Sequence, residues 1–390
     1  MAAIEYIVFF NNVAADQKRL DLIEEVTVVQ EVDKPWEARV QIPVCVNNDG
    51  KWEGEDEAWM RAYNRVRIEA KIGDAAYAPL IDGPIVGFDT ARSPQPGKSV
   101  VTLIVHDDSA FLNRQAKVER YEGKTDSAIA KQVFQEVTQI SGGFDIPEET
   151  PPPPANTADV TMQRGTKWQF LRELARRHEN WHAYVLPGTE PGKSIGAFRK
   201  YRTEPDGLPP MLLLGDDRNI AEFNVTNNPR NPCVVRTSTL AISDKSVRTS
   251  TANYRDQTLL SDRPANDSDA GDEATCLMPP TLGDLVDPDS ATGGASSASG
   301  YSSEATGSVI PHCYTGVLAP YRVVLVRISD SKLSGKYLIT KVTHTLTRST
   351  YTQAFEMKGN GFTEEDPASA AGPQASASVS VSFNVQVSIF

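Results

Sequence analysis

The chain has 390 residues, of which 39% are hydrophobic and 23% charged, and its formal net charge is −12 at pH 7. A chain of this length can bury sizeable cores but is long for a single one, so we expect two or three domains. The acidic surplus argues against tight wrapping of nucleic acid, because neutralising phosphates requires clustered Lys and Arg side chains. It does not exclude a conduit through which DNA or another acidic cargo slides.

The N-terminal sequence MAAIEYIVFFNNV has no basic segment before its short apolar run and no small-residue cleavage site. It therefore predicts a first strand and not a secretion signal. No apolar run approaches the roughly 20 residues that a membrane-spanning helix needs, so we expect a soluble protein made in the cytoplasm. The four cysteines, at positions 45, 233, 276 and 313, form no CxxC pair, which argues against a zinc ribbon or a redox motif.

Strand patterns dominate the first part of the chain. Val, Ile and aromatic side chains alternate in part over residues 4–10, 22–32, 37–46 and 65–72, with turn residues between them. A hairpin is predicted from residues 83–88 and 99–105, because the turn cluster SPQPG separates them. We predict a first tube-like β domain over residues 1–112.

The middle of the chain changes to a helical period. Apolar side chains from Ile129 to Val137 recur at three- and four-residue steps behind a cap at Thr125, and Ser141 begins the expected stop. A second amphipathic helix is predicted from a cap near Thr166 through Trp168, Leu171, Leu174, Ala175 and His178. The proline run 151–154 is an extended spacer. We predict an α+β domain with two helices over residues 113–219.

Strand patterns return in the last part, at residues 321–328, 335–347 and 351–358, and predict a second tube-like β domain over residues 220–365. Residues 289–308 are expected to be a mobile loop in it, because their small, mostly uncharged side chains bury little apolar surface. Residues 366–390 are expected to be a flexible tether that ends in a strand. Short stretches of the two β regions also match: residues 68–74 resemble 324–330, and residues 83–86 resemble 335–338. Duplication and coincidence both remain open, because strand, loop, Gly and strand form a common pattern.

Five segments, in order, resemble the phage late-control protein D family, which comprises contractile tail hubs. They are LIDGPIVG at 80–87, VTLIVHDDSAFL at 101–112, YEGKTDSAIA at 121–130, WQFLRELA at 168–175 and GKYLITKVTH at 335–344. The resemblance covers residues 1 to about 362. It implies a mainly β chain in which two tube-like antiparallel β-barrel domains flank a mixed domain. The family includes the hub portion of the type VI secretion spike.

The resemblance also implies a function and partners. The expected protein is a structural hub of a phage tail, bacteriocin or injection particle, in which a homotrimer adapts the hexameric tail tube to the trimeric spike and forms part of the central channel. Its expected partners are a tail tube protein, baseplate wedge proteins and a separate spike protein, since no spike domain follows about residue 365. DNA or protein cargo only passes through. The chain would be made in the bacterial cytoplasm and then join the particle, without membrane insertion, cofactor or enzymatic activity.

The alternative is a zinc metallohydrolase, because His178, Glu179 and His182 match the HExxH motif. In such enzymes two histidines one helical turn apart hold zinc and the glutamate activates water. Residues 184–188 read as a strand running into a turn, so we expect His182 beyond the helix and His178 on its face. The segment His106-Asp107-Asp108-Ser109 is expected to cap a turn rather than to catalyse. We therefore expect no catalytic and no metal-ligating residues.

The C-terminus carries the clearest period-2 pattern of the chain. Apolar and polar side chains alternate to the end, with the apolar ones at Val379, Val381, Phe383, Val385, Val387 and Ile389. No charged residue occurs from Pro367 to Phe390, so nothing discourages this segment from pairing with another strand. We expect it to bind the spike or its own copies at the trimer axis by β-augmentation. Folding back on its own barrel is the alternative.

Overall fold

The computed structural model describes residues 4–362 apart from 54–56, 96, 153–159, 229, 232, 241–244, 266–273, 279–287, 329–330 and 332. The predicted C-terminal strand, Val379 to Ile389, lies outside the described residues. No helix in the described ranges is both long and apolar enough to span a bilayer.

The first part of the chain forms the first β region. Its elements are β1 (Ile4–Phe10), β2 (Val13–Ala14), α1 (Gln17–Leu20), β3 (Glu25–Glu31), β4 (Glu37–Pro43), β5 (Cys45–Val46), β6 (Trp52–Glu53), the 3-10 turn η1 (Ala58–Met60), β7 (Arg65–Ile72), β8 (Ala78–Ala91), β9 (Val100–His106) and α2 (Ser109–Leu112). Alternate side chains of β3 and β4 are buried, as the period-2 pattern predicts. The predicted strands and the hairpin of β8 with β9 are confirmed.

The middle region holds two helices and two small sheets. Its elements are β10 (Ala116–Glu122), α3 (Asp126–Gln135), β11 (Phe144–Asp145), β12 (Val160–Thr166), α4 (Lys167–Arg176), β13 (Trp181–Pro187) and β14 (Ser194–Lys200). Both predicted caps are confirmed: the Thr125 side chain accepts from Ala128 N, and Thr166 forms a capping box with Gln169. Helix α3 ends before the predicted stop at Ser141, because tighter turns close residues 134–140.

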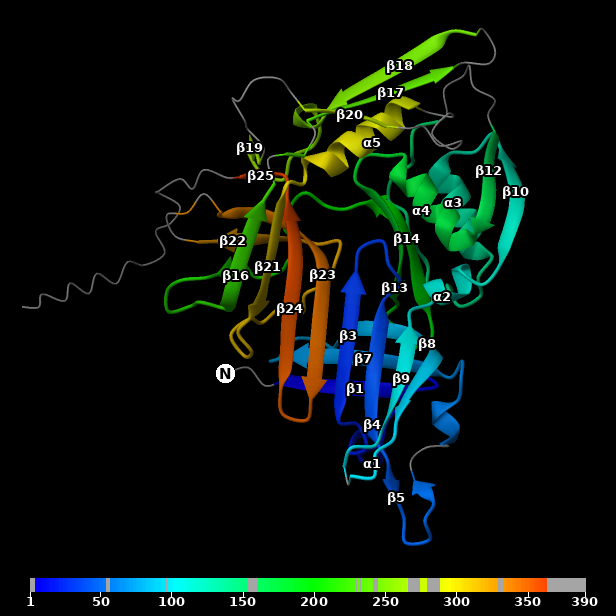
Figure 1. Cartoon of the computed structure of the whole chain (residues 1–390), viewed down its shortest axis with the longest axis vertical. Helices are drawn as coiled ribbons and strands as arrows, with labels where there is room; N and C mark the ends of the chain where they lie inside the picture. The colour runs from blue at the N-terminus through cyan, green and yellow to red at the C-terminus, as the bar shows by residue number, and fades with distance from the viewer. Residues whose placement is uncertain are drawn as a thin grey trace, which may run out of the picture.

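The last part forms the second β region and a small layer above it. Its elements are β15 (Met211–Leu212), β16 (Ile220–Asn227), β17 (Val234–Leu240), β18 (Val247–Asn253), the 3-10 turn η2 (Tyr254–Asp256), β19 (Arg263–Pro264), β20 (Thr275–Leu277), α5 (Pro288–Gly300), β21 (Ser303–Val309), β22 (Val323–Arg327), β23 (Gly335–Thr347), β24 (Tyr351–Gly359) and β25 (Gly361–Phe362). Strands β17, β18 and β20 form the small layer with α5 (Figure 1).

One large sheet runs through both β regions. Its strands follow the order β16, β21, β24, β23, β3, β4, β9, β8, β7, β1 and β2, and β23 also pairs with β22 (Figure 1). The two regions meet where β3 pairs antiparallel with β23. The predicted fold class, a mainly β chain with a mixed middle, is confirmed. The domain boundaries stay a prediction.

The two β regions share one topology except at their first strands, because β1 pairs antiparallel with β7 whereas β15 pairs parallel with β22. Strands β1, β3, β4, β7, β8 and β9 lie in the spatial order β1, β7, β8, β9, β4, β3. Strands β15, β16, β21, β22, β23 and β24 lie in the order β15, β22, β23, β24, β21, β16, so the same chain positions occupy the same places. Each long strand also carries one extra residue against its neighbour, Val86 in β8 and Thr340 in β23. When Val86 is aligned with Thr340, the two regions superpose in a register that differs by two residues from the short matches found in the sequence.

The expectation of a mobile loop at residues 289–308 is wrong. These residues form helix α5 and most of strand β21. Their small side chains permit close packing: a Cβ on Gly294 would lie 2.8 Å from the carbonyl oxygen of Arg176, and one on Gly300 would lie 2.8 Å from the Tyr254 ring. Thr292 and Ser296 are fully buried. The low content of large apolar residues thus reflects tight packing, not a lack of structure.

A buried ionic network joins the first β region to the middle region. Arg65 donates to Asp82 (2.7 Å) and to Asp108, which also accepts from the Ser194 hydroxyl at 2.6 Å. Arg67 donates to Asp82 (3.0 Å) and to the carbonyl oxygen of Gly188 (2.8 Å). Both carboxylates are fully buried. The β13–β14 hairpin is therefore fixed to β7, β8 and the segment after β9 by charges that have little access to water.

Replacing Gly294 with Ala should lower the free energy of unfolding, because the new methyl group meets backbone that cannot easily move. We expect a loss of about 1–3 kcal/mol relative to Gly293→Ala, the matched control. A Cβ added at Gly293 would lie 4.0 Å from the nearest atom. Gly293→Ala should therefore raise the free energy of unfolding by up to about 1 kcal/mol, because Ala has the higher helix propensity. Urea unfolding compares the two variants. Equal stability would contradict the close packing of α5.

Asp107 should make stability depend on pH. Its carboxyl accepts from the Trp36 and Ser109 backbone N–H groups, and complete burial raises its pKa to about 7. Because the folded-state pKa lies above the ordinary value of 3.8, the contribution to stability is full below about pH 4 and is lost as pH rises through about 7. Urea unfolding of Asp107→Asn should show a smaller decline over this range. Asp49→Asn, at an exposed position, is the control; an unchanged decline in Asp107→Asn would refute the assignment.

Candidate functional site

The HExxH residues lie in a turn between a helix and a strand. Helix α4 ends at Arg176, so His178 lies beyond it and not on its face, which corrects the prediction. Asn180, with φ of 57°, turns the chain into β13, which carries His182 as expected. The two histidines are thus not one helical turn apart on a helix, the arrangement that an HExxH zinc site requires.

The three motif side chains bind three different partners. His178 Nε2 lies 2.9 Å from an Asp126 oxygen, and His182 Nδ1 lies 3.1 Å from an Asp33 oxygen. Glu179 accepts from the backbone N–H of Thr258 at 2.9 Å. Within the described ranges, no group of three or more His, Cys, Asp or Glu side chains could hold a metal ion. The motif therefore joins the turn to α3 within the middle region, and joins the middle region to the β3–β4 turn and to the loop after η2.

Helix α5 packs directly on this turn. The Ser297 hydroxyl donates to the Asn180 side chain at 2.9 Å, and the close approach of Gly294 to the Arg176 and His178 carbonyl groups leaves no room for a side chain. A helix of small residues thus covers the turn closely at Arg176, His178 and Asn180.

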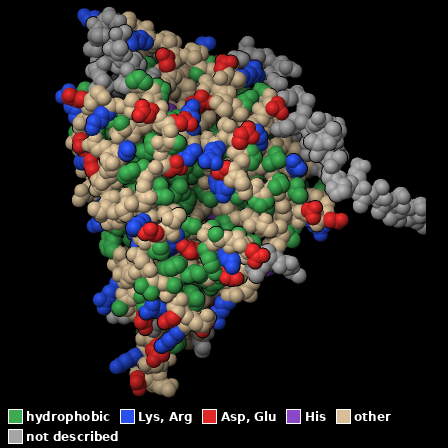
Figure 2. All heavy atoms as spheres, turned by 180° about the vertical axis from the view of Figure 1, so that it is seen from behind, with side chains coloured by type: hydrophobic (Ala, Val, Ile, Leu, Met, Phe, Trp, Pro, Cys, Tyr) green, Lys and Arg blue, Asp and Glu red, His purple; other side chains and the backbone are tan. Residues whose placement is uncertain are grey.

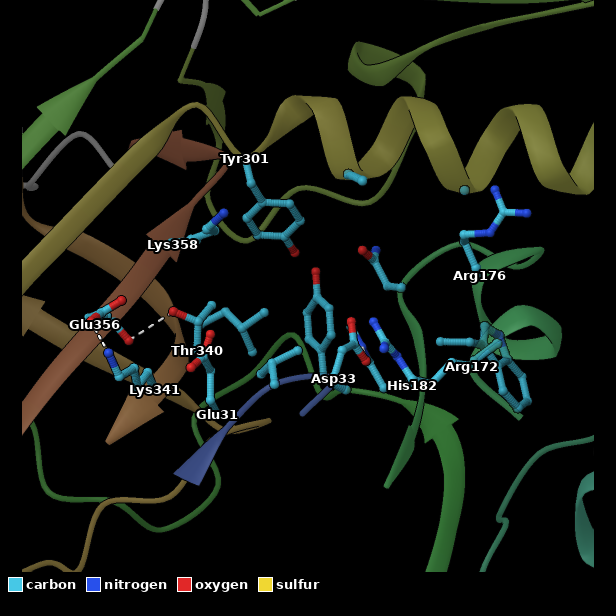
Figure 3. A pocket seen from close by; sticks show the side chains of 18 of the residues that line it. Glu31, Asp33, Arg172, Arg176, His182, Tyr301, Thr340, Lys341, Glu356 and Lys358 are labelled. Carbon is cyan, nitrogen blue, oxygen red and sulfur yellow. Dashed lines mark hydrogen bonds and ion pairs between the residues drawn. The ribbon is translucent and has the colours of Figure 1, made fainter. Parts of the chain in front are cut away.

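A half-open cavity of about 770 Å³ lies beside the turn, between the middle region and the second β region, and its lining includes His178 and His182 as well as Gly294 and Ala298 of α5. Figure 3 shows Lys341, Lys358 and Glu356 on one wall and Arg172 and Arg176 on the opposite wall. Lys341 pairs with Glu356 at 2.7 Å and Lys358 with Glu304 at 3.1 Å. The cations on the strand wall are therefore matched by carboxylates.

The floor of the cavity contains Asp33 and His182. Burial opposes the charged form of Asp33, but the hydrogen bond from His182 and the nearby charges hold the pKa of this carboxyl below its ordinary value. The Tyr201 ring lies 5.8 Å from the His182 ring, and the Tyr201 and Tyr301 hydroxyls are buried without a partner among the described residues. Nothing in the sequence linked His182 to Asp33, since 149 positions separate them.

The face of the molecule seen in Figure 2 does not gather its charges by sign. On the face opposite to the view of Figure 1, Lys and Arg side chains alternate with Asp and Glu side chains, and apolar side chains lie between them (Figure 2). A continuous basic track, which phosphate backbones require, is not visible on this face. The candidate interaction residues at the C-terminus, from Val379 to Ile389, lie outside the described residues.

Comparisons with known proteins relate the chain through its fold. No protein-family model matches the sequence, and no curated protein matches it. Among solved structures, the 43 kDa tail protein of prophage MuSo2 from Shewanella oneidensis is similar with a TM-score of 0.61 at 12% identity, over 91% of this chain and 98% of that one. A tail protein from Neisseria meningitidis gives 0.57 at 15% identity, over 92% and 96%.

A third solved structure extends the likeness to secretion systems. A component of the type VI secretion system of E. coli, described as structurally similar to T4 bacteriophage tail proteins, gives a TM-score of 0.52 at 13% identity, over 87% of this chain and 74% of that one. The resemblance to tail hubs that the five sequence segments indicate is thereby confirmed for the fold. The chain has the fold of phage tail proteins.

Proposed function

We propose that the chain is a structural hub of a contractile tail or injection particle, three copies of which adapt a hexameric tail tube to a trimeric spike and form part of the central channel. The observation that carries this proposal is the shared topology of the two β regions. Three chains with two similar regions each present six similar units to the tube and three identical faces to the spike. The fold shared with phage tail proteins supports the same function.

The proposal includes the partners and the location. The tube protein meets the six β regions, a separate spike protein meets the threefold face, and baseplate wedge proteins surround the hub. DNA or protein cargo only passes through the channel, and no membrane insertion is involved. The chain is made in the bacterial cytoplasm and then becomes part of the particle.

The proposed role is not enzymatic and uses no cofactor. The HExxH residues support this view, because His182 and Glu179 bind partners in other regions of the chain and His178 binds Asp126 of the neighbouring helix α3. Likewise, Asp108 accepts hydrogen bonds inside the network that joins two regions, and Asp107 accepts from the Trp36 backbone N–H within the first β region. These polar groups act as structural contacts, and the zinc metallohydrolase reading has no observation in its favour.

The purified chain should form a threefold particle, alone or with its spike partner, because only a matching trimer buries the faces of a threefold spike evenly. Native mass spectrometry should give three times the chain mass of 42.6 kDa. The same measurement after mixing with the spike protein should give a complex with three copies of each. A chain that stays monomeric in both samples would contradict the hub function.

We propose that the C-terminal strand, with Val379, Val381, Phe383, Val385, Val387 and Ile389 on its apolar face, adds to the spike at the threefold axis. Deleting residues 379–390 should leave the trimer and its binding to the tube intact but weaken its binding to the spike at least about tenfold. Replacing Ser380, Ser382 and Ser388 with Thr is the control, since it retains the pattern. Unchanged spike affinity after the deletion would disprove this docking.

A further inference from the structure

Several strand edges of the large sheet have no partner strand in the described part of the chain, among them β16 and the outer half of β8. Strand β16 ends the sheet and pairs only with β21. The outer half of β8, from Gly87 to Ala91, pairs with β9 on one side. Its other side is open, because the pairing of β8 with β7 ends at Pro84. Figure 1 shows β16 and β8 at opposite flanks of the sheet.

Each of these two edges has an equivalent in the other β region, and the two equivalents pair with each other inside the chain. The β-bulges align Gly87 with Lys341, and from there β23 continues beside β3 as far as Thr347. Strand β16 corresponds to β3 in the shared topology. The seam between β3 and β23 therefore shows, inside one chain, the contact that β16 and the outer half of β8 lack.

The pairing registers give residue equivalences across the sheet. Gly87, Ile104, Arg39 and Thr27 face one another in β8, β9, β4 and β3. Their counterparts Lys341, Glu356, Thr306 and Asn224 face one another in β23, β24, β21 and β16. This superposes EVTVVQ at 25–30 on EFNVTN at 222–227, two sequences with the same first residue and the same apolar positions near it.

The exposure of apolar side chains differs at these equivalent positions. Val342 in β23 is fully buried, whereas its counterpart Phe88 in β8 is 44% exposed. Val26 and Val28 in β3 are fully buried, whereas their counterparts Phe223 and Val225 in β16 are only partly buried. Both open edges thus leave apolar side chains partly exposed at positions whose counterparts are buried in the internal seam.

We infer that β16 of one copy pairs antiparallel with the outer half of β8 of the next copy, in the register of the internal seam. Thr27 faces Thr345 in the seam, so Asn224 faces Ala91, Val225 faces Thr90 and Thr226 faces Asp89 between copies. The two edges differ, so the contact is head to tail, the kind of contact that builds either a closed ring or an open filament. Only the closure at three copies rests on the proposed hub function.

Disulfide cross-linking tests the register. In a background with Ser at Cys45, Cys276 and Cys313, the three exposed cysteines, the pair Asp89→Cys and Thr226→Cys should cross-link between chains on mild oxidation. The control pair Asp89→Cys and Val225→Cys should cross-link at least about tenfold less, because a shift of one residue moves the second thiol to the other face of the strand. No product from the first pair, or equal product from both, overturns the pairing.

The same experiment separates this inference from the proposed function. A ladder of products in denaturing gels that stops at three chains supports both. A ladder that continues beyond three supports the edge pairing and refutes closure of the hub as a trimer. A native trimer that gives no 89–226 product refutes the edge pairing and leaves the hub function in place.

A surface substitution gives a second readout. Phe88→Glu should weaken association of the copies at least about tenfold in analytical ultracentrifugation, because a charge would be buried in the new seam. The circular dichroism spectrum should stay unchanged, and so should the melting temperature at concentrations where the chain is monomeric, since Phe88 is 44% exposed in the single chain. Val118→Glu, at an exposed position on β10, is the matched control. Association unaffected by Phe88→Glu would contradict the pairing.

Discussion

The antiparallel seam between β3 and β23 is the contact on which the architecture depends. It joins residues 25–31 to residues 341–347 and makes one sheet of two β regions. A buried chain of hydrogen bonds crosses it: Gln30 donates to the Leu80 carbonyl oxygen (2.6 Å), and His344 lies 3.2 Å from Gln30 and 2.8 Å from the Tyr351 hydroxyl. Burial lowers the pKa of His344 to about 3, so the ring stays neutral at physiological pH. The neutral ring can donate to one partner and accept from the other, which fixes the seam without a buried charge.

The middle region is held by a different kind of contact. Where the seam uses neutral groups, Arg65 and Arg67 face two fully buried carboxylates at the β13–β14 hairpin. Losing one member would leave an opposite charge buried and unpaired, so this junction tolerates little relative movement. Its second contact with the first β region, at the HExxH turn, joins His182 to Asp33. The middle region is thus held to the first β region at two sites.

Local chemistry explains which features the sequence could predict. Thr125 and Thr166 are caps because their side chains satisfy nearby N–H groups, and such contacts span only three residues. The same locality explains the errors. Residues 289–308 are poor in large apolar groups, yet Gly294 and Gly300 face distant backbone and a distant ring that no local pattern reveals. The two-residue shift in the repeat has a related cause, since a period-2 pattern matches equally well after any even shift.

An edge that waits for a partner must satisfy two opposing demands. It has to stay soluble in the single chain, yet it must still match the partner strand when that strand arrives. The open edges carry polar groups that meet both. Thr27 and Gln30 in β3 correspond to Asn224 and Asn227 in β16, and an exposed Asp89 on β8 lies 3.1 Å from Arg39. These side chains keep water at the edges and leave the backbone free to form the ladder. The internal seam needs no such protection, because one chain supplies both of its strands at once. The replacement of one apolar residue of β3 by a polar residue in β16, Val29 against Thr226, therefore follows from when each strand finds its partner, during folding for β3 and during assembly for β16.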